Sequence, residues 1–576
     1  HEFAVTIVVA ILLSGFVSIS LTPMLCSRLL KGAHEETNGW MFRVTEWFFQ
    51  MMLRWYEWTL KLVLRFRPVM LAVFAATIWL TMYLFEIVPK GFIPDQDSDS
   101  MYANTEAIQG ISYYKMAEYQ QRIARIISSD ENVESMMTSA GGSFNQSANT
   151  ARSFITLKPR KERPLSVTQI IDKLRPEFGG FVGARVFLTA PPAIRIGGRM
   201  SKAQYEYTLQ GPDVDELYRV APGLQRAIAQ IPGITDVTSD LQMRNPRLNV
   251  KVDRDKVASM HLNMRDVSNA MYDAFGPRWS STIYAPNAQY KVLLEVQPEY
   301  QEHPDLLSKL YFKNREGVLI PMDAFATTYT DAGPQTIAHN GQLPSVTISY
   351  NLLPGTALGD VVGEIEEAAS RLPGTIQTSF QGTAKAFQDS MQNMTTLLII
   401  AVLVVYICLG VLYESYVHPL TILSGLPSAG LGALATLVLF RQELNVYAFV
   451  GLFMLVGIVK KNAIMQIDFA LEAERKEGKS PMDAIYEGCV IRFRPILMTT
   501  LAALLGVLPI AIGFGAGGET RRPLGLAVAG GLIVSQFVTL YLTPVVYTYL
   551  DSLVYLWRRS GRKHRAGEPS PAAAGD

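Results

Sequence analysis

The chain has 576 residues, of which 49% are hydrophobic and 18% charged, and its formal net charge is +1. This balance gives no sign of a nucleic-acid-binding surface or of an acidic partner. Three cysteines, Cys26, Cys408 and Cys489, are too few and too far apart for a disulfide framework or a zinc site, and we interpret them as inert buried thiols.

Seven stretches are apolar and long enough to cross a bilayer as helices, which takes about 20 residues. They are 3–26, 69–88, 395–413, 420–440, 446–471, 495–516 and 524–550. About 300 residues of ordinary soluble composition separate the second stretch from the third. The other connections are short, apart from a linker at 27–66 and a predicted loop at 472–494. The sequence therefore predicts a multi-pass membrane protein with one large soluble insert.

The distribution of Lys and Arg predicts the orientation. The linker, the predicted loop and the tail after residue 550 fall on one side of the membrane and together contain sixteen basic residues. The connections on the other side contain only Arg441, Arg521 and Arg522. The basic side is expected to be cytoplasmic, which places the insert outside, in the periplasm of a Gram-negative cell.

The linker and the two ends have compositions of their own. Tryptophans mixed with basic residues predict an amphipathic helix within 27–66 that lies in the membrane interface. Residues 569–576 are small residues and Pro, from which we expect no ordered structure. The chain begins at His1 and enters an apolar span without a charged region or a cleavage site, so we expect a fragment of a longer protein and no signal peptide.

The insert contains repeated strand–helix–strand units in which a Pro-Gly pair follows the helix. The predicted units are 205–211, 214–231 and 234–240, then 344–352, 357–372 and 375–382. An earlier set has helices at 116–129 and 165–178 and strands at 152–159 and 184–189. These patterns predict small α+β sandwiches of the split βαβ kind, the second interrupted by residues 241–333.

The fifth apolar stretch is the only one with several ionisable residues, namely Lys460, Lys461 and Asp468, together with Asn462. A charge at membrane depth is costly unless it is paired or hydrated. Lys461 and Asp468 are seven residues apart and share a helix face, whereas Lys460 points elsewhere. Lys460 is compatible with a snorkelling side chain, and Asp468 with a place near the headgroups. Lys461 is interpreted as functional, with a carboxylate supplied from elsewhere.

The sequence predicts no nucleotide-binding domain that could drive transport. Gly478, Lys479 and Ser480 end like a phosphate-binding loop, but Ala473 stands where its first glycine belongs and no strand precedes it. The glycine-rich run 513–518 follows an apolar span and is read as a connecting loop. The driving force is therefore expected to be an ion gradient, with no cofactor.

Four long motifs resemble those of one transporter family. They are VPKGFIPDQD (88–97), LYESYVHPLTILSGLPSAGLGAL (412–434), GIVKKNAIMQIDFALEAER (457–475) and VIRFRPILMTTLAALLGVLPIAIG (490–513). They resemble the hydrophobe/amphiphile efflux branch of the resistance-nodulation-division (RND) pumps, and within it the MdtB/MdtC type. Leu-Thr-Pro also ends both the first and the last span, at 21–23 and 542–544, as internal duplication would produce.

The resemblance implies a fold class: an α-helical membrane bundle, here the sixth to twelfth of twelve spans, with a periplasmic α+β insert of ferredoxin-like porter subdomains and a docking subdomain. The implied boundaries are 1–26 for the sixth span, 27–66 for the linker, 67–89 for the seventh span, 90–240 and 334–390 for the porter, 241–333 for the docking part, 391–550 for spans eight to twelve and 551–576 for the tail.

The resemblance also implies the site residues. The proton relay would comprise Lys461, Asn462, Asp468, Arg492 and Thr499, with two partner aspartates on a fourth span that this sequence does not contain. The substrate pocket would include Met137, Gly142 and Phe144, where Met137 and Gly142 replace the aromatic residues expected of the family. One methionine pair is too little for a metal-exporting pump, so no metal site is expected.

The implied function is proton-driven efflux of lipophilic drugs, bile salts or detergents across the bacterial inner membrane. The implied partners are RND subunits in a homo- or heterotrimer, a periplasmic adaptor and an outer-membrane channel. One alternative stays open, a companion subunit of a mixed trimer that does not itself translocate substrate. A sterol-sensing or protein-export relative would need neither residues 241–333 nor the Lys-Lys-Asn-Ala-Ile motif at 460–464.

Overall fold

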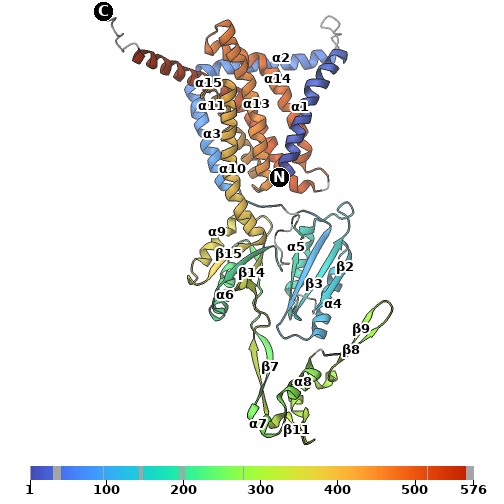
Figure 1. The fold of residues 1–576 in the computed structure, drawn as a ribbon. Helices are drawn as coiled ribbons and strands as arrows, with labels where there is room; N and C mark the ends of the chain where they lie inside the picture. Colours follow the sequence, from blue (N-terminus) through green and yellow to red (C-terminus); the bar gives the residue numbers. More distant parts are fainter. Residues whose placement is uncertain are drawn as a thin grey trace, which may run out of the picture.

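The computed structural model describes residues 2–29, 40–94, 96–141, 147–192, 194, 196, 202–276, 278–301, 303–515 and 517–565. A bundle of long helices forms one end of the molecule, and a mixed α/β insert extends from it (Figure 1). Two chain crossings join these parts, one after α3 (Arg67–Ile87) and one at the start of α10 (Gly382–Tyr413).

Within the described residues, seven helical segments are long and apolar enough to cross a membrane. Besides α3 and α10 they comprise α1 (Glu2–Leu29), α11 (His418–Leu423) with α12 (Leu426–Leu439) as one span, α13 (Val446–Glu477), α14 (Pro481–Ile512) and α15 (Gly518–Arg565). Each of the seven apolar stretches of the sequence falls within one of these spans, apart from a few residues at the ends, so the prediction of seven apolar helices and a mixed insert is confirmed.

The predicted loop at 472–494 is wrong. α13 continues to Glu477, and α14 begins four residues later at Pro481. Gly478 ends α13 in the left-handed conformation, with φ +66°, and the Ser480 hydroxyl accepts a hydrogen bond from the Asp483 backbone amide at the start of α14. Both helices extend beyond their apolar segments as polar turns, which hydropathy alone assigns to a loop.

α15 is the most buried helix of the bundle and packs against α12, α13 and α14. α15 approaches α12 closely, because a Cβ at Gly530 would collide with the Thr436 side chain and the Gly432 carbonyl. Small residues let the two backbones meet, as they do in membrane bundles generally. By contrast, every side chain of α1 from Val5 to Arg28 is exposed.

The first sandwich is a four-stranded antiparallel sheet in the order β2-β3-β1-β4, covered by two helices. Met101 and Ile155 from the sheet pack against Ile123 and Leu174 from the helices. Its elements are β1 (Ser100–Ala107), α4 (Tyr113–Ser128), β2 (Val133–Ala140), β3 (Thr150–Leu157), α5 (Val167–Gly179) and β4 (Ala184–Thr189).

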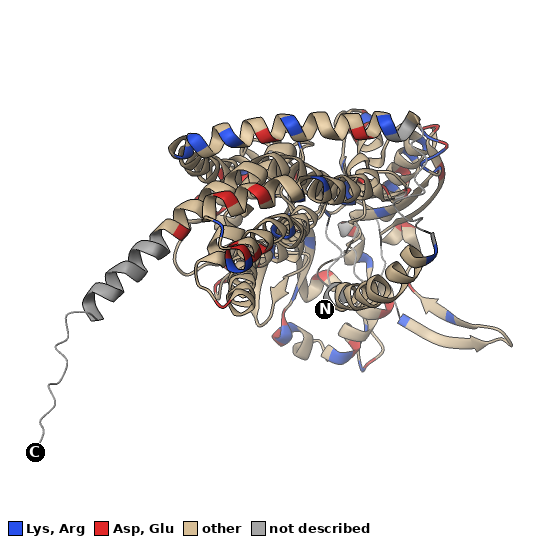
Figure 2. Ribbon diagram, turned by 90° about the horizontal axis from the view of Figure 1, so that it is seen from above, with Lys and Arg blue, Asp and Glu red and all other residues tan. Residues whose placement is uncertain are grey.

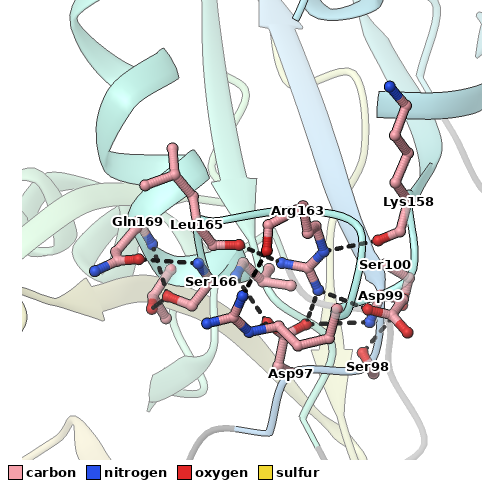
Figure 3. Close-up of polar contacts among 12 residues, drawn as sticks. Asp97, Ser98, Asp99, Ser100, Lys158, Arg163, Leu165, Ser166 and Gln169 are labelled. Atoms are coloured by element: carbon pink, nitrogen blue, oxygen red, sulfur yellow. Dashed lines mark hydrogen bonds and ion pairs between the residues drawn. The ribbon is translucent and has the colours of Figure 1, made fainter. Parts of the chain in front are cut away.

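A buried arginine fastens the segment between α3 and β1 to the first sandwich (Figure 3). The Arg163 guanidinium is fully buried and donates to the carboxylates of Asp97 and Asp99, the latter at 2.6 Å. The second Asp97 oxygen accepts from the Val167 amide at 3.2 Å, at the start of α5. The sandwich is therefore held to the end of a spanning helix through a short, hydrogen-bonded segment.

The second sandwich is a five-stranded sheet in the order β13-β14-β5-β15, with β6 also paired to β14. Tyr207, Ile348 and Phe380 of the sheet pack against Leu224 and Ile365 of its two helices. Its elements are β5 (Tyr205–Gln210), α6 (Val214–Ala229), β6 (Ile234–Ser239), β13 (His339–Asn340), β14 (Leu343–Leu352), α9 (Leu358–Ala369) and β15 (Gln377–Gln381).

A two-stranded ribbon leads from the second sandwich to a smaller lobe far from the bundle (Figure 1). Phe312, Met322 and Phe325 form the centre of the lobe. The ribbon is β7 (Asn245–Val252) with β12 (Ala326–Gly333), and the lobe contains α7 (Arg254–Ser259), α8 (Met264–Phe275), β8 (Arg278–Tyr284), β9 (Gln289–Leu294), β10 (Tyr311–Lys313), β11 (Leu319–Pro321) and short 3-10 turns at Pro298–Tyr300, Pro304–Lys309 and Met322–Ala324.

Candidate functional site

The candidate site lies on α13, the helix that carries the predicted charges. Asn445 caps its first turn by accepting from the Ala448 amide at 3.0 Å. The helix packs against α12, α14 and α15. One face is uncovered, and its exposed residues recur at helical spacing: Met454, Gly457, Lys461, Asp468, Glu472 and Arg475.

Lys461 and Asp468 thus share the uncovered face of α13, as their spacing predicts. In the described part of the chain, Lys461 has no ion pair within 4 Å and no hydrogen bond to another side chain. Asp468 accepts a hydrogen bond from the Tyr413 hydroxyl at the end of α10. Lys460 is half-buried and lies to one side of this face. The arrangement leaves the exposed Lys461 ammonium without a polar partner among the described residues.

Asn462 points the other way, into the bundle, where it joins a buried polar triad. Its amide nitrogen donates to the Thr500 hydroxyl of α14 at 3.2 Å and to the Gln536 carbonyl oxygen of α15 at 3.1 Å. Thr500 in turn donates to the same Gln536 oxygen at 2.7 Å. The triad ties three spanning helices together one residue from Lys461.

Gln466 lies one turn further along α13 and is fully buried. Neither atom of its amide has a hydrogen-bond partner among the described residues, and the Gln536 amide nitrogen also lacks one. Buried amides are rarely left in this state. Sequence reasoning missed Thr500, Gln536 and Gln466 because it searched the apolar spans for charges, whereas uncharged amides in the same spans were the available signal.

The other two predicted relay residues form no hydrogen bond with Lys461 in the described structure. The Arg492 guanidinium lies over the Phe469 ring of α13, 5.7 Å from its centre. Thr499 donates to the Ile496 carbonyl of its own helix at 3.1 Å. The neighbouring residue, Thr500, is the one that reaches α13.

The predicted pocket residues belong to the first sandwich. Met137 lies on the edge strand β2 opposite Phe154 and is 65% exposed. Gly142 and Phe144 lie outside the described residues. A cavity of about 430 Å³ lies elsewhere, between the two sandwiches and the connection 441–445 from α12 to α13. Arg175, Tyr205 and Glu443 contribute to its lining.

Metal-ligating side chains do not gather in the part of the chain that the structure describes. No group of three or more His, Cys, Asp or Glu side chains there is close enough to hold an ion. On α13, the described residues offer the unpaired Lys461 ammonium, the hydrogen-bonded Asp468 carboxylate and a buried amide network.

Comparison with known proteins gives a family match over nearly the whole chain. The model described as "AcrB/AcrD/AcrF family" matches residues 1–551. The chain is 40% identical over 569 residues to multidrug resistance protein MdtC of Proteus mirabilis (strain HI4320). The aligned region covers 98% of this chain and 55% of that protein. It is 43% identical over 558 residues to multidrug resistance protein MdtC of Escherichia coli O139:H28, covering 96% and 54%. The chain spans about half the length of the curated relatives it matches.

Proposed function

The chain belongs to the AcrB/AcrD/AcrF family, and on that premise we propose that it is part of an inner-membrane permease that exports drugs and amphiphiles in exchange for protons. In this proposal the spanning helices carry the proton step and the two sandwiches carry the substrate. The MdtC proteins that it resembles are multidrug resistance proteins by name, which supports efflux as the activity.

The observation that carries the proposal is the free Lys461 on the uncovered face of α13. An unpaired ammonium group inside a bilayer is costly, so a carboxylate from outside the described residues is expected to pair with it. Protonation of that carboxylate would break its ion pair with Lys461, and release of the proton would restore the ion pair. Because Asn462 lies next to Lys461 and binds α14 and α15, a shift of Lys461 would reach both helices.

The soluble insert would supply the substrate path. We assign Met137, Gly142 and Phe144 to the substrate pocket, where an adaptable apolar surface suits loose recognition. The insert would face the periplasm, as the excess of basic residues on the opposite side supports. The permease would assemble as a trimer and work with a periplasmic adaptor and an outer-membrane channel.

Transport by single-site variants of the full-length permease in proteoliposomes tests the proposal. With an imposed pH gradient, Lys461→Ala is expected to abolish drug uptake, and Lys461→Arg to retain part of it because the charge remains. Lys460→Ala is the matched control, since that neighbouring lysine lies off the uncovered face, and it is expected to transport normally.

Normal transport by Lys461→Ala would refute the relay assignment. If the permease were then found in a mixed trimer whose other subunits sustained efflux, the alternative of a companion subunit that does not itself translocate substrate would be favoured. All variants must first be shown to fold and assemble like the unmodified protein, by elution volume and helix content.

A further inference from the structure

A cluster of aromatic and acidic side chains lies at the end of the bundle away from the insert. α10 begins at the insert and ends on that far side, where a short turn, 414–417, leads into α11 (Figure 1). We call this turn the α10–α11 junction. The excess of Lys and Arg favours the cytoplasm for the same side of the membrane.

His418, the first residue of α11, lies between two tyrosines from different helices. Its ring stacks on the Tyr547 ring of α15, with 6.1 Å between centres and 21° between planes. It also meets the Tyr413 ring at the end of α10, with 6.4 Å between centres and 64° between planes. Both distances are typical of aromatic pairs. The imidazole therefore links the end of α10 to α15.

Each of the two tyrosines is hydrogen-bonded to a carboxylate of α13. The Tyr413 hydroxyl donates to Asp468, and the Tyr547 hydroxyl donates to Glu474 at 2.7 Å. Asp468 lies on the face of α13 that carries Lys461. The aromatic stack thus connects α10, α11 and α15 to the helix of the candidate site.

The charged groups around the aromatic stack are mainly acidic. They are Glu414 of the junction, Asp468 and Glu474 of α13 and Asp551 of α15, with Arg475 of α13 as a basic neighbour of Glu474. Helix α2 (Trp40–Arg65) crosses the same end along one edge of the bundle, and acidic positions also gather where the last helix extends out of the bundle (Figure 2). A positively charged imidazole would be attracted to these carboxylates and to the faces of the tyrosine rings.

We propose that His418 binds the exchanged proton on its cytoplasmic side, and that its protonated ring holds the α10–α11 junction against α13 and α15. Histidine suits this place because its charge changes between about pH 5 and 8. A ring nitrogen of His418 gains the proton that leaves the face of α13 and passes it to cytoplasmic water. The ring is then neutral, and the junction loosens. The inference rests on the proposed function, because it assigns the cytoplasmic end of the same proton path.

Hydrogen exchange of the full-length permease in detergent tests whether His418 holds the junction, without any measurement of transport. After correction for the intrinsic pH dependence, amides in 414–424 should exchange about threefold more slowly at pH 6 than at pH 8, because the charged ring gains a cation–π contact. His418→Phe keeps an aromatic ring that cannot be protonated, so the difference should disappear, as it should in the smaller neutral variant His418→Gln. His339→Phe is the matched control, because His339 is an exposed histidine of the insert, and it should keep the difference.

Drug transport in everted membrane vesicles tests the place of His418 in the proton path, because the outer face of these vesicles is the cytoplasmic one. The external pH is lowered from 8 to 6 while the pH difference across the membrane is held constant. The unmodified permease and His339→Phe should both slow, by about threefold, because the protonated ring persists for longer. His418→Phe should be slower than the unmodified permease at pH 8, since water alone must accept the proton, and should lose the dependence on external pH.

Three results would overturn the inference and leave the proposed function intact. Equal amide protection of the junction at both pH values in the unmodified permease would show that His418 does not hold it. A difference in protection that survives in His418→Phe would assign the proton to another group of the cluster. Slowing of His418→Phe by the same factor as the unmodified permease would remove His418 from the proton path.

Absence of drug transport by the unmodified permease would instead refute the proposed function, and the place of His418 in the proton path with it. The amide-exchange comparison would then decide alone whether a protonated His418 holds the junction.

Discussion

Single residues in the bundle show what spacing can predict and what it cannot. The common face of Lys461 and Asp468 follows from seven residues of helix, so the sequence predicts it. The partners of Asn462 are 38 and 74 residues away, on α14 and α15, and only the packing of three helices brings them together. Thr499 and Thr500 are adjacent, and helix rotation decides that Thr500, not Thr499, reaches α13.

The polar triad should stabilise the contact among α13, α14 and α15. Gln536→Leu removes the acceptor shared by Asn462 and Thr500, and we expect a loss of about 1 kcal/mol, within the range for hydrogen bonds between membrane helices. Thermal unfolding in detergent measures the loss. Ser535→Ala is the control, because among the described residues the buried Ser535 hydroxyl binds only the Leu532 carbonyl of its own helix. Equal melting of both variants would contradict a stabilising triad.

Asp130, at the end of α4, should give the first sandwich a dependence on pH. Burial raises the pKa of its carboxyl group, but hydrogen bonds from Lys173 and Asn132 outweigh this and lower the pKa below its ordinary value of 3.8. The stabilisation is therefore present above about pH 4 and is lost as pH falls through the lowered pKa of the folded protein.

We expect Asp130→Asn to weaken hydrogen-exchange protection around α5 at pH 6 by about 1 kcal/mol, a figure reduced because Lys173 is nearly half exposed. The difference from the unmodified protein should vanish in strong acid. The control is Asp172→Asn, because the Asp172 carboxylate is 45% exposed and lies 3.9 Å from Arg175. This variant should keep the hydrogen-exchange protection of the unmodified protein at both pH values. A difference that is the same at both pH values would exclude the ion pair as its cause.

At the scale of elements, the sequence predicts apolar segments better than helix ends. Both ends of strand 184–189 are predicted correctly, because turn-forming residues flank it and β-branched side chains lie within it. β1 and β2 were not predicted, since β1 is enclosed on both edges by strands distant in sequence and β2 is a largely exposed edge strand. The polar ends of α13 and α14 were assigned to a loop because hydropathy detects the membrane and not the helix.

The turn between α13 and α14 depends on Gly478, whose φ of +66° disfavours any side chain. Gly478→Ala is expected to destabilise the bundle by about 1 kcal/mol, as an unfavourable left-handed residue does. Gly506→Ala in α14 is the opposite case, because a Cβ there meets nothing within 4 Å and Ala favours helix. The melting temperature should fall for Gly478→Ala and should not fall for Gly506→Ala. Equal decreases for both variants would count against a strained turn.

At the scale of the whole molecule, uncovered surfaces indicate what the chain has yet to contact. Every described side chain of α1 from Val5 onward is exposed, and so is the face of α13 that carries Lys461. Apolar spans exposed on all sides need lipid or further helices, and a lysine at membrane depth needs a carboxylate. Composition predicted the seven spans, but it could not predict which helix faces would remain uncovered, because these depend on how the spans pack.

Proton flux that accompanies drug movement tests the central claim most directly. The full-length permease is reconstituted in proteoliposomes with a pH-sensitive dye inside, and drug is added without nucleotide. The account predicts that drug transport and proton counterflow begin together and that Lys461→Ala abolishes both. Drug movement without proton flux, or equal fluxes in the unmodified and Lys461→Ala proteins, would contradict it.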